Sequence, residues 1–255
     1  MKAIIVGATS GIGKEIALNL INKGWSVGIS GRRLSLLENI QSEYDKKRVF
    51  VSEMDVTRPD ATTGLDALIS AMGAPDLLLY VSGIGYENIK LEPDKEIRTL
   101  QTNCEGMARI IVHFFNYVRN SPDIYTPNKK AHVAVVTSIA GTAGLGTAPA
   151  YSASKRMQST YISALSQLSR MESVPIHFSD IRPGFVKTAI LDADKHYPLT
   201  MSVEQAAKHI IKGLQQKKRV ITFDWKYKIF VFFWRLIPRP VWERLTIIKA
   251  TEKQH

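Results

Sequence analysis

Short apolar runs alternate with longer amphipathic stretches along most of the chain. The runs are rich in Val, Ile and Leu and predict strands at residues 2–6, 25–30, 48–53, 76–81, 131–137, 174–181 and 219–223. Apolar residues at helical spacing predict helices after Gly13, over 34–46, 57–72, 94–119, from Tyr151 to about 171, and over 202–216. This alternation, without repeat or linker, predicts an α/β fold with a doubly wound parallel sheet of about seven strands in a single domain.

The pattern changes after the last predicted strand. Residues 1–223 are predicted to form one nucleotide-binding and catalytic domain of Rossmann type. Residues 224–255 are predicted to form a basic, aromatic, helical C-terminal extension, because three of the four Trp lie among Lys and Arg there. Residues 217–249 contain nine Lys or Arg but only two acidic residues, Asp224 and Glu243, so most of the formal charge of +11 lies at this end of the chain.

A glycine-rich turn follows the first predicted strand at once. It reads Gly7-Ala8-Thr9-Ser10-Gly11-Ile12-Gly13 and leads directly into a helix. Strand, glycine turn and helix aim backbone N–H groups and a helix N-terminus at a pyrophosphate. The position of the turn therefore predicts a dinucleotide site that includes Gly7, Thr9, Ser10, Gly11, Ile12 and Gly13.

The end of the second predicted strand indicates which dinucleotide binds. An NAD site favours a carboxylate there, but Gly31 takes that place and Arg32 and Arg33 follow. Guanidinium groups suit a 2′-phosphate, so NADP(H) is the predicted cofactor; a basic helix start on the surface is the alternative. Asp55, at the end of the third strand, either binds the adenine amino group or caps the loop.

Tyr151 and Lys155 lie four residues apart on a predicted helix and therefore share one face. An ammonium near a phenol favours the phenolate and lowers the phenol pKa, which suits proton exchange with a carbonyl oxygen. The spacing alone is common on solvated helices. Its context adds weight, because Gly83, Ser138 and Pro183 all fall at predicted strand ends, where ligands of such sheets bind.

Together these residues resemble the short-chain dehydrogenase/reductase family, from residue 1 to about 216. The matching features are Gly7-xxx-Gly11-x-Gly13, Asp55-Val56, Asn103, Ser138, Tyr151-xxx-Lys155 and Pro183-Gly184 with Thr188. The resemblance implies a catalytic tetrad of Asn103, Ser138, Tyr151 and Lys155. It implies that Tyr151 donates the proton, Lys155 lowers its pKa and holds the nicotinamide ribose, Ser138 hydrogen-bonds the carbonyl, and Asn103 binds a relay water. Implied cofactor contacts are Gly83, Val56, Tyr151, Lys155, Pro183, Gly184, Val186 and Thr188.

The chain departs from the family pattern at two places. Tyr80-Val81-Ser82-Gly83 replaces the usual Asn-Asn-Ala-Gly after the fourth strand, which affects local packing of the central strand. Val6 stands where a threonine usually precedes the first glycine.

The substrate side is less specific. Between residues 185 and 202 a short loop carries Ile190, Leu191, Tyr197, Pro198 and Leu199, which suits a lid over a partly apolar pocket. Aromatic and cationic residues in the extension favour either a helix lying on a membrane surface or one packed on the pocket or a neighbouring subunit. Nucleic-acid binding is a distant third interpretation, and no nucleic-acid partner is expected.

Composition excludes several classes. The single cysteine, Cys104, precludes an internal disulfide, and the six His lack metal-ligand spacing, so no metal is expected. No signal peptide or run of eighteen apolar residues is present, which predicts a cytoplasmic protein, at most peripheral on a membrane.

The expected activity is NADP(H)-dependent reduction of a ketone, or oxidation of the matching secondary alcohol, on a hydrophobic substrate such as a lipid-like compound, by a homodimer or homotetramer. The alternatives are an epimerase or keto-sugar reductase acting on a membrane-held polyprenyl sugar, and a non-catalytic NADP(H)-binding sensor.

Overall fold

The computed structural model describes the chain except residues 189, 191–196, 198, 224 and 246–255. Its seven strands form one sheet in the order β3-β2-β1-β4-β5-β6-β7, and every pairing is parallel. The strands are β1 Lys2–Val6, β2 Ser26–Gly31, β3 Val49–Glu53, β4 Leu77–Tyr80, β5 Ala131–Val136, β6 Ile176–Pro183 and β7 Val220–Phe223. The predicted fold class is confirmed, and each predicted strand is present within about two residues.

The helices follow the predicted alternation. They are α1 Gly11–Asn22, α2 Leu34–Ser42, α3 Ala61–Met72, α4 Pro93–Leu100, α5 Gly106–Arg119, α6 Pro149–Met171, α7 Val203–Gln215, α8 Trp225–Leu236 and α9 Arg239–Trp242. The long helix predicted over 94–119 contains a π-helical turn, η1 (Gln101–Glu105), between α4 and α5. A short 3₁₀ turn, η2 (Ile139–Thr142), follows β5.

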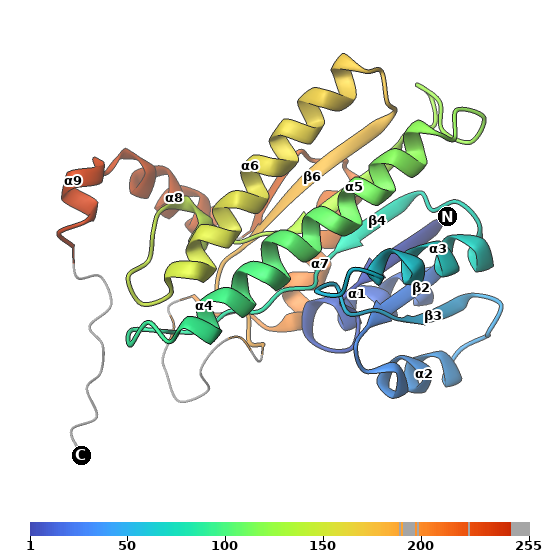
Figure 1. Cartoon of the computed structure of the whole chain (residues 1–255), viewed down its shortest axis with the longest axis horizontal. Coiled ribbons are helices and arrows are strands. Elements are labelled where there is room, and N and C mark those ends of the chain that lie inside the picture. The colour runs from blue at the N-terminus through green and yellow to red at the C-terminus, as the bar shows by residue number, and fades with distance from the viewer. Residues whose placement is uncertain (189, 191–196, 198, 224, 246–255) are drawn as a thin grey trace.

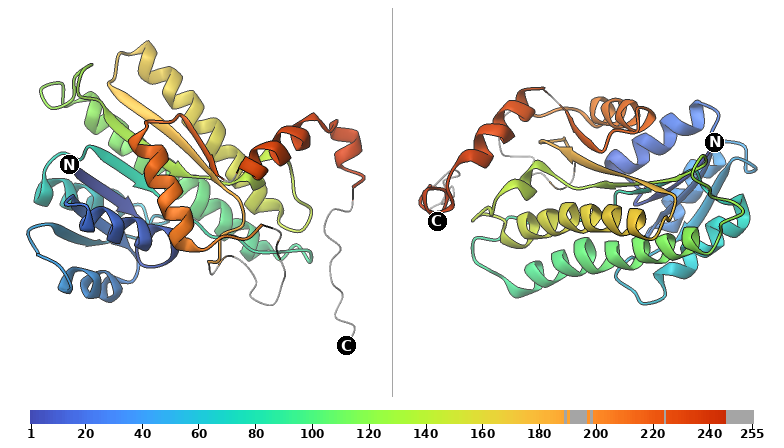
Figure 2. Two further views of the ribbon diagram at one scale, coloured as in Figure 1. Left: turned by 180° about the vertical axis from the view of Figure 1, so that it is seen from behind. Right: turned by 90° about the horizontal axis from the view of Figure 1, so that it is seen from above.

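The sheet is covered on both faces (Figure 1, Figure 2). Alternate strand residues face opposite layers, because side chains of a strand alternate in direction. Ile4 and Val6 of β1 join a core with α3, α5 and α6. Ala3 and Ile5 join a second core with α1, α2 and α7. The strands are thus buried on both sides, which explains their near-continuous apolar runs.

The carboxyl ends of the parallel strands lie at one edge of the sheet. The glycine-rich turn after β1, the segment after β4, η2 after β5 and Gly184 after β6 all belong to this edge. A ligand site is expected there for a doubly wound sheet.

The C-terminal helices pack against this same edge. The Tyr227 and Trp234 side chains of α8 are buried, and Trp242 Nε1 donates a hydrogen bond of 2.7 Å to the Gly144 carbonyl after η2. The Trp234 and Trp242 rings lie 5.0 Å apart. Figure 2 shows α8 and α9 at the end of the molecule where α6 begins. The described part of the extension therefore contacts the predicted catalytic domain. Within the described residues, no helix combines the length and apolarity that crossing a membrane requires.

Candidate active site

Tyr151 and Lys155 lie in the first turns of α6, as the sequence predicts. Lys155 Nζ is 5.7 Å from the centre of the Tyr151 ring. The backbone at Gly85, after β4, closely approaches this ring, because a Cβ there would lie 2.5 Å from Tyr151 Cδ2. The Gly85 backbone therefore packs closely on the phenol ring, and a larger residue at this position would displace the ring.

Lys155 is buried and held at its tip. Nζ donates hydrogen bonds to the Val136 carbonyl at 3.0 Å and to Gln158 Oε1 at 3.1 Å. Burial lowers the pKa of Lys155 to about 8, against the opposing influence of Cys104 and Asp180. The lysine is therefore poised to change charge near physiological pH.

The pKa of the Tyr151 phenol is raised, whereas the nearby lysine is expected to lower it. Burial raises the pKa of Tyr151 above its ordinary value, and a hydrogen bond with the Ser138 side chain acts in the lowering direction. Ser138 itself follows β5 and caps η2, where its Oγ accepts a hydrogen bond from Ala140 N at 3.0 Å. Ser138 and Tyr151 thus lie together at the strand ends.

Asn103 is fully buried in the π-helical turn η1. Its side chain bonds both backbone groups of Ile84, with distances of 2.9 Å to the N–H and 2.8 Å to the carbonyl, and donates to Ser154 Oγ at 2.9 Å. A Cβ on Gly83 would lie 3.2 Å from Asn103 Oδ1 and 3.4 Å from Lys155 Nζ. The structure therefore brings Asn103, Ser138, Tyr151 and Lys155 around the segment that follows β4.

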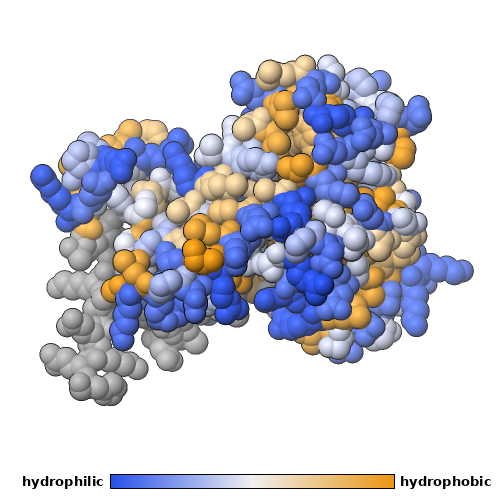
Figure 3. Space-filling view, in the orientation of Figure 1, coloured by the Kyte–Doolittle hydropathy of each residue, from blue (hydrophilic) through white to orange (hydrophobic). Residues whose placement is uncertain are grey.

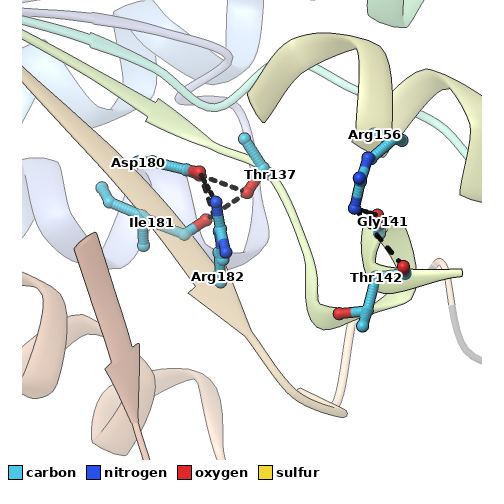
Figure 4. A network of polar contacts seen from close by, with 7 residues as sticks. All are labelled: Thr137, Gly141, Thr142, Arg156, Asp180, Ile181 and Arg182. Atoms are coloured by element: carbon cyan, nitrogen blue, oxygen red, sulfur yellow. Dashed lines mark hydrogen bonds and ion pairs between the residues drawn. The ribbon is translucent and has the colours of Figure 1, made fainter. Parts of the chain in front are cut away.

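Sequence reasoning missed several supporting residues. Buried Asp180 accepts a hydrogen bond from Thr137 Oγ1 at 2.6 Å and pairs with Arg182, whose Nη2 lies 2.6 Å away (Figure 4). This network ties β5 to β6 beneath the active-site edge. An acid and a base two residues apart on a strand share one face, which is the only sequence signal for it. Figure 4 also shows Arg156 directed at the carbonyls of Gly141 and Thr142 in η2.

The glycine-rich turn has the backbone geometry of a phosphate cradle. Gly7 and Gly11 have φ angles of 96° and 56°, which favour glycine. A Cβ at Gly13 would lie 2.0 Å from the Gly7 carbonyl oxygen, so the helix starts in direct contact with the turn. Thr9, Ser10 and Ile12 lie within the same turn, and Thr188 is beside it, with Cγ2 3.6 Å from a Cβ built on Gly11. These residues fit a dinucleotide pyrophosphate.

The two arginines occupy the side of the turn where the adenosine end of a dinucleotide belongs. Arg33 Nη2 donates to Thr9 Oγ1 at 2.7 Å and Ser10 Oγ at 3.1 Å. Asp55 Oδ1 accepts hydrogen bonds from the N–H and hydroxyl of Thr57. Burial acts to raise the pKa of Asp55, but the Thr57 hydrogen bonds and the Arg32 and Arg58 charges hold it below its ordinary value. Asp55 is thus an ionised loop cap close to Arg32.

The remaining predicted cofactor contacts lie after β3 and around the end of β6. Val56 is buried against Gly106 of α5, and Val186 is buried and pairs with Met201. Gly184, after Pro183, packs on the Tyr227 ring of α8, since a Cβ on this glycine would lie only 2.2 Å from Tyr227 Cε2. Of the predicted lid residues, Leu191 and Pro198 lie outside the described residues. Ile190 and Leu199 are exposed, and the Tyr197 ring lies 5.0 Å from Phe185.

The departures after β4 are accommodated. Tyr80 is fully buried in the core, and its hydroxyl lies 3.2 Å from the Thr102 carbonyl beside η1. Ser82 N–H bonds the Val6 carbonyl at 2.9 Å, so the segment stays joined to β1. Among the described residues, no group of three metal-ligating side chains is present.

Comparisons with known proteins agree with this arrangement. A family model described as short chain dehydrogenase matches residues 1–197. An uncharacterized oxidoreductase from Myxococcus xanthus is 31% identical over 248 residues, which cover 94% of each chain.

Solved structures share the fold at lower identity. An alcohol dehydrogenase from the archaeon Thermococcus sibiricus, complexed with 5-hydroxy-NADP, is 20% identical with a TM-score of 0.72, covering 87% of this chain and 94% of that one. A short-chain dehydrogenase/reductase from Burkholderia phymatum in complex with NAD is 17% identical with a TM-score of 0.74, covering 91% of both chains. Because the family model covers most of the sequence and the Myxococcus relative matches nearly its full length, the chain belongs to the short-chain dehydrogenase/reductase family of oxidoreductases.

Proposed function

We propose that this protein is an NADP(H)-dependent reductase of ketones, acting in reverse on the matching secondary alcohols. The observation that carries the proposal is the group of Tyr151, Lys155 and Ser138 at the strand ends, with Asn103 locked behind them. A phenol that shares a hydrogen bond with a serine and lies beside a buried ammonium is arranged to protonate a carbonyl oxygen.

Each residue has a distinct role in this proposal. Tyr151 gives its proton to the carbonyl oxygen, and Ser138 hydrogen-bonds the same oxygen and stabilises its developing charge. Lys155 favours the phenolate that remains, because its ammonium lies near the phenol ring. NADPH supplies the hydride when it is bound, whereas position and electrostatics come from the protein. Asn103 holds Ile84 and Ser154 in place around the site.

The preference for NADP(H) rests on Arg32 and Arg33. Both follow directly after β2. A side chain at position 31, where an NAD site favours a carboxylate, would be crowded by Thr9, since a Cβ there would lie 2.7 Å from Thr9 Cγ2. A 2′-phosphate carries negative charge that guanidinium groups bind well. The Thr9, Ser10, Arg32 and Arg33 side chains would hold that end of the cofactor, and the N–H groups of the turn would hold the pyrophosphate.

A hydrophobic, lipid-like substrate is favoured by the surroundings of the site. Buried Tyr227 of α8 lies against Gly184, with its hydroxyl 3.3 Å from Phe185 N. On the outer side of α8, Ile229, Phe232, Phe233 and Leu236 are exposed at helical spacing. An exposed apolar stripe among cationic residues suits an anionic membrane surface. We propose that the extension contacts the membrane peripherally. A protein at the membrane surface could also act on the alternative substrate, a polyprenyl-linked sugar.

Self-association is a further part of the proposal. Leu91, Ile97 and Leu100, in α4 and the loop before it, are exposed. Figure 3 shows hydrophobic side chains at the surface over this part of the molecule. Exposed apolar surface of this kind favours pairing with a second copy, in a homodimer or homotetramer. Light scattering on the purified protein measures this; a monomer at all concentrations would contradict it. The predicted cytoplasmic location stays a prediction.

The experiment that tests the function is a panel of ketones mixed with the protein and NADPH or NADH. The nicotinamide absorbance reports turnover. We expect oxidation of NADPH with at least one apolar ketone and much slower oxidation of NADH. NADPH binding without turnover of any ketone or of any secondary alcohol with NADP would favour a non-catalytic sensor instead.

A further inference from the structure

Gln158 lies one turn beyond the Tyr151–Lys155 pair on α6 and is completely buried. Its Oε1 accepts the hydrogen bond from Lys155 Nζ at 3.1 Å. Its Nε2 donates to the backbone carbonyl of Asn103 at 2.8 Å. Both ends of the carboxamide are thus used, and the reverse orientation would place N–H groups against an ammonium and a lone pair against a carbonyl. The two contacts define the orientation of the amide.

The partner carbonyl belongs to the π-helical turn η1. Asn103 is joined to α6 twice, by its side chain at Ser154 and by its backbone carbonyl at Gln158. Ser154 and Gln158 are four residues apart and so share one helix face. Turns of this type interrupt the regular i→i+4 bonding and recur at functional sites. Here the interrupted turn supplies a carbonyl for a side chain of another helix.

The Lys155 ammonium has three N–H donors, and acceptors among the described residues engage two of them. One goes to Val136 on β5 and the other to Gln158 on α6. The Tyr151 ring on the same helix lies 5.7 Å from Lys155 Nζ, and Cys104 on η1 and Asp180 on β6 act to raise the Lys155 pKa. A neutral amide stabilises the buried ammonium and leaves its charge intact, whereas a carboxylate at the same place would neutralise it.

We propose that Gln158 is a positioning residue, whose carboxamide ties the Lys155 ammonium to the Asn103 carbonyl and leaves one N–H of Lys155 for the ligand. The proposal rests on the proposed function for its kinetic consequence only. The family resemblance implies that Asn103 binds a relay water that links Lys155 to solvent. In this chain the Gln158 side chain joins Lys155 directly to the Asn103 carbonyl. Gln158 acts through Lys155 and does not touch the reacting atoms.

Two substitutions separate positioning from simple packing. Gln158→Met keeps the length and helix preference of the side chain but removes both hydrogen bonds. Gln158→Glu keeps the geometry of the acceptor and adds a negative charge. The matched controls are Gln167→Met and Gln167→Glu, because Gln167 is exposed on the same helix. Circular dichroism confirms that each variant is folded.

The primary readout needs no substrate. NMR of ¹³Cε-lysine follows the titration of Lys155, which is assigned by its loss in Lys155→Met. We expect a midpoint near the value of about 8 that burial gives the wild type. Gln158→Met should lower it, and Gln158→Glu should raise it, each by about one pH unit, because a favourable partner of the charged form is lost or strengthened. The Gln167 variants should titrate as the wild type does.

The second readout is the pH profile of kcat for a ketone that the wild type reduces. The midpoint of the limb that depends on Lys155 should shift to lower pH in Gln158→Met and to higher pH in Gln158→Glu. Gln158→Met should also lower kcat by about tenfold, an effect no larger than that of groups that assist proton transfer. An identical Lys155 midpoint in wild type, Gln158→Met and Gln158→Glu would overturn the inference, even if ketones are reduced. If the Lys155 midpoint is lower in Gln158→Met and higher in Gln158→Glu than in wild type, but no ketone is reduced, the role of Gln158 is supported and only the proposed function is refuted.

Discussion

The guanidinium of Arg33 donates a hydrogen bond of 2.7 Å to the hydroxyl oxygen of Thr9. This contact joins the end of β2 to the glycine-rich turn after β1, two segments that are 24 residues apart in the sequence. It places a positive charge at the side of the turn where the adenosine of a dinucleotide belongs in this fold. Arg32 is adjacent and acts on Asp55 at the end of β3. Besides their proposed contact with the cofactor, Arg33 therefore stabilises the glycine-rich turn, and Arg32 lowers the pKa of Asp55.

The cofactor proposal predicts different behaviour for the two arginines. Arg32→Ala should weaken NADPH binding about tenfold and leave NADH binding nearly unchanged, because a charge-assisted contact to the 2′-phosphate is lost. Arg33→Ala should weaken both cofactors, since it also removes the hydrogen bonds to Thr9 and Ser10. Fluorescence titration of the reduced nicotinamides measures the dissociation constants.

Arg170→Ala is the control for these variants, because Arg170 is exposed in the last turn of α6. It should bind both cofactors as the wild type does. Equal affinity for NADPH and NADH, unchanged by Arg32→Ala, would refute the NADP preference.

The close contact inside the glycine-rich turn predicts a steric effect. Gly13→Ala places a methyl group 2.0 Å from the Gly7 carbonyl oxygen, so the turn and the start of α1 must move apart. We expect a loss of about 1–3 kcal/mol in the free energy of unfolding, together with weaker NADPH binding. Gly146→Ala is matched to it, because a Cβ at Gly146 meets nothing within 4 Å. Urea unfolding of both variants tests the comparison; equal stability would show that the turn relaxes freely.

Burial of Lys155 makes stability depend on pH. Its pKa falls from 10.5 to about 8 on folding, so between these values the unfolded chain binds the extra proton and stability rises with pH. Below pH 8 the lysine is charged in both states, and burial of its charge lowers the free energy of unfolding by on the order of 3 kcal/mol, at about 1.4 kcal/mol per pH unit. Lys155→Met removes this titration. Its stability relative to wild type should therefore fall as pH rises from 8 to 10.5.

Lys212→Met is the matched control for that measurement, since Lys212 is exposed on α7. Chemical unfolding at a series of pH values gives both curves. A constant difference between wild type and Lys155→Met across the window would contradict the burial argument.

The exposed face of α8 predicts binding to anionic vesicles. Phe232 and Phe233 are 60% and 62% exposed, and serine at both positions removes the largest apolar side chains of the stripe. We expect wild type to sediment with phosphatidylglycerol vesicles more than with phosphatidylcholine vesicles, and the double serine variant to lose most of this binding. Met171→Ser, at the far end of α6, should bind as wild type does. Equal sedimentation of wild type and double variant would favour a face that packs on another subunit.

Most of the sheet could be predicted from the sequence, because strands buried on both faces leave continuous apolar runs. Tyr151 and Lys155 could be placed on one helix face for a similar reason, since i and i+4 spacing is local. The relation between Ser138 and Tyr151 required the family spacing in addition, as it joins the end of a strand to a helix.

Other features depend on contacts that no local pattern records. The π-helical turn at Asn103 has no signal in residue spacing, because its neighbours continue the same amphipathic face. The link from Gln158 to Asn103 spans 55 residues and depends on how η1 and α6 pack. The direction of the Tyr151 pKa also differs from the local expectation, because burial, a property of the whole fold, raises the pKa and outweighs the hydrogen bond with Ser138.

The most direct test of the proposed chemistry is kcat of Tyr151→Phe with NADPH and the best ketone of the panel. The variant keeps the ring against Gly85 but lacks the acidic proton, so kcat should fall by about a hundredfold or more while the NADPH dissociation constant stays within about twofold. Tyr161→Phe, on the same helix, should keep wild-type kcat. Ketone reduction by Tyr151→Phe at the wild-type rate would contradict the assignment of Tyr151 as the proton donor.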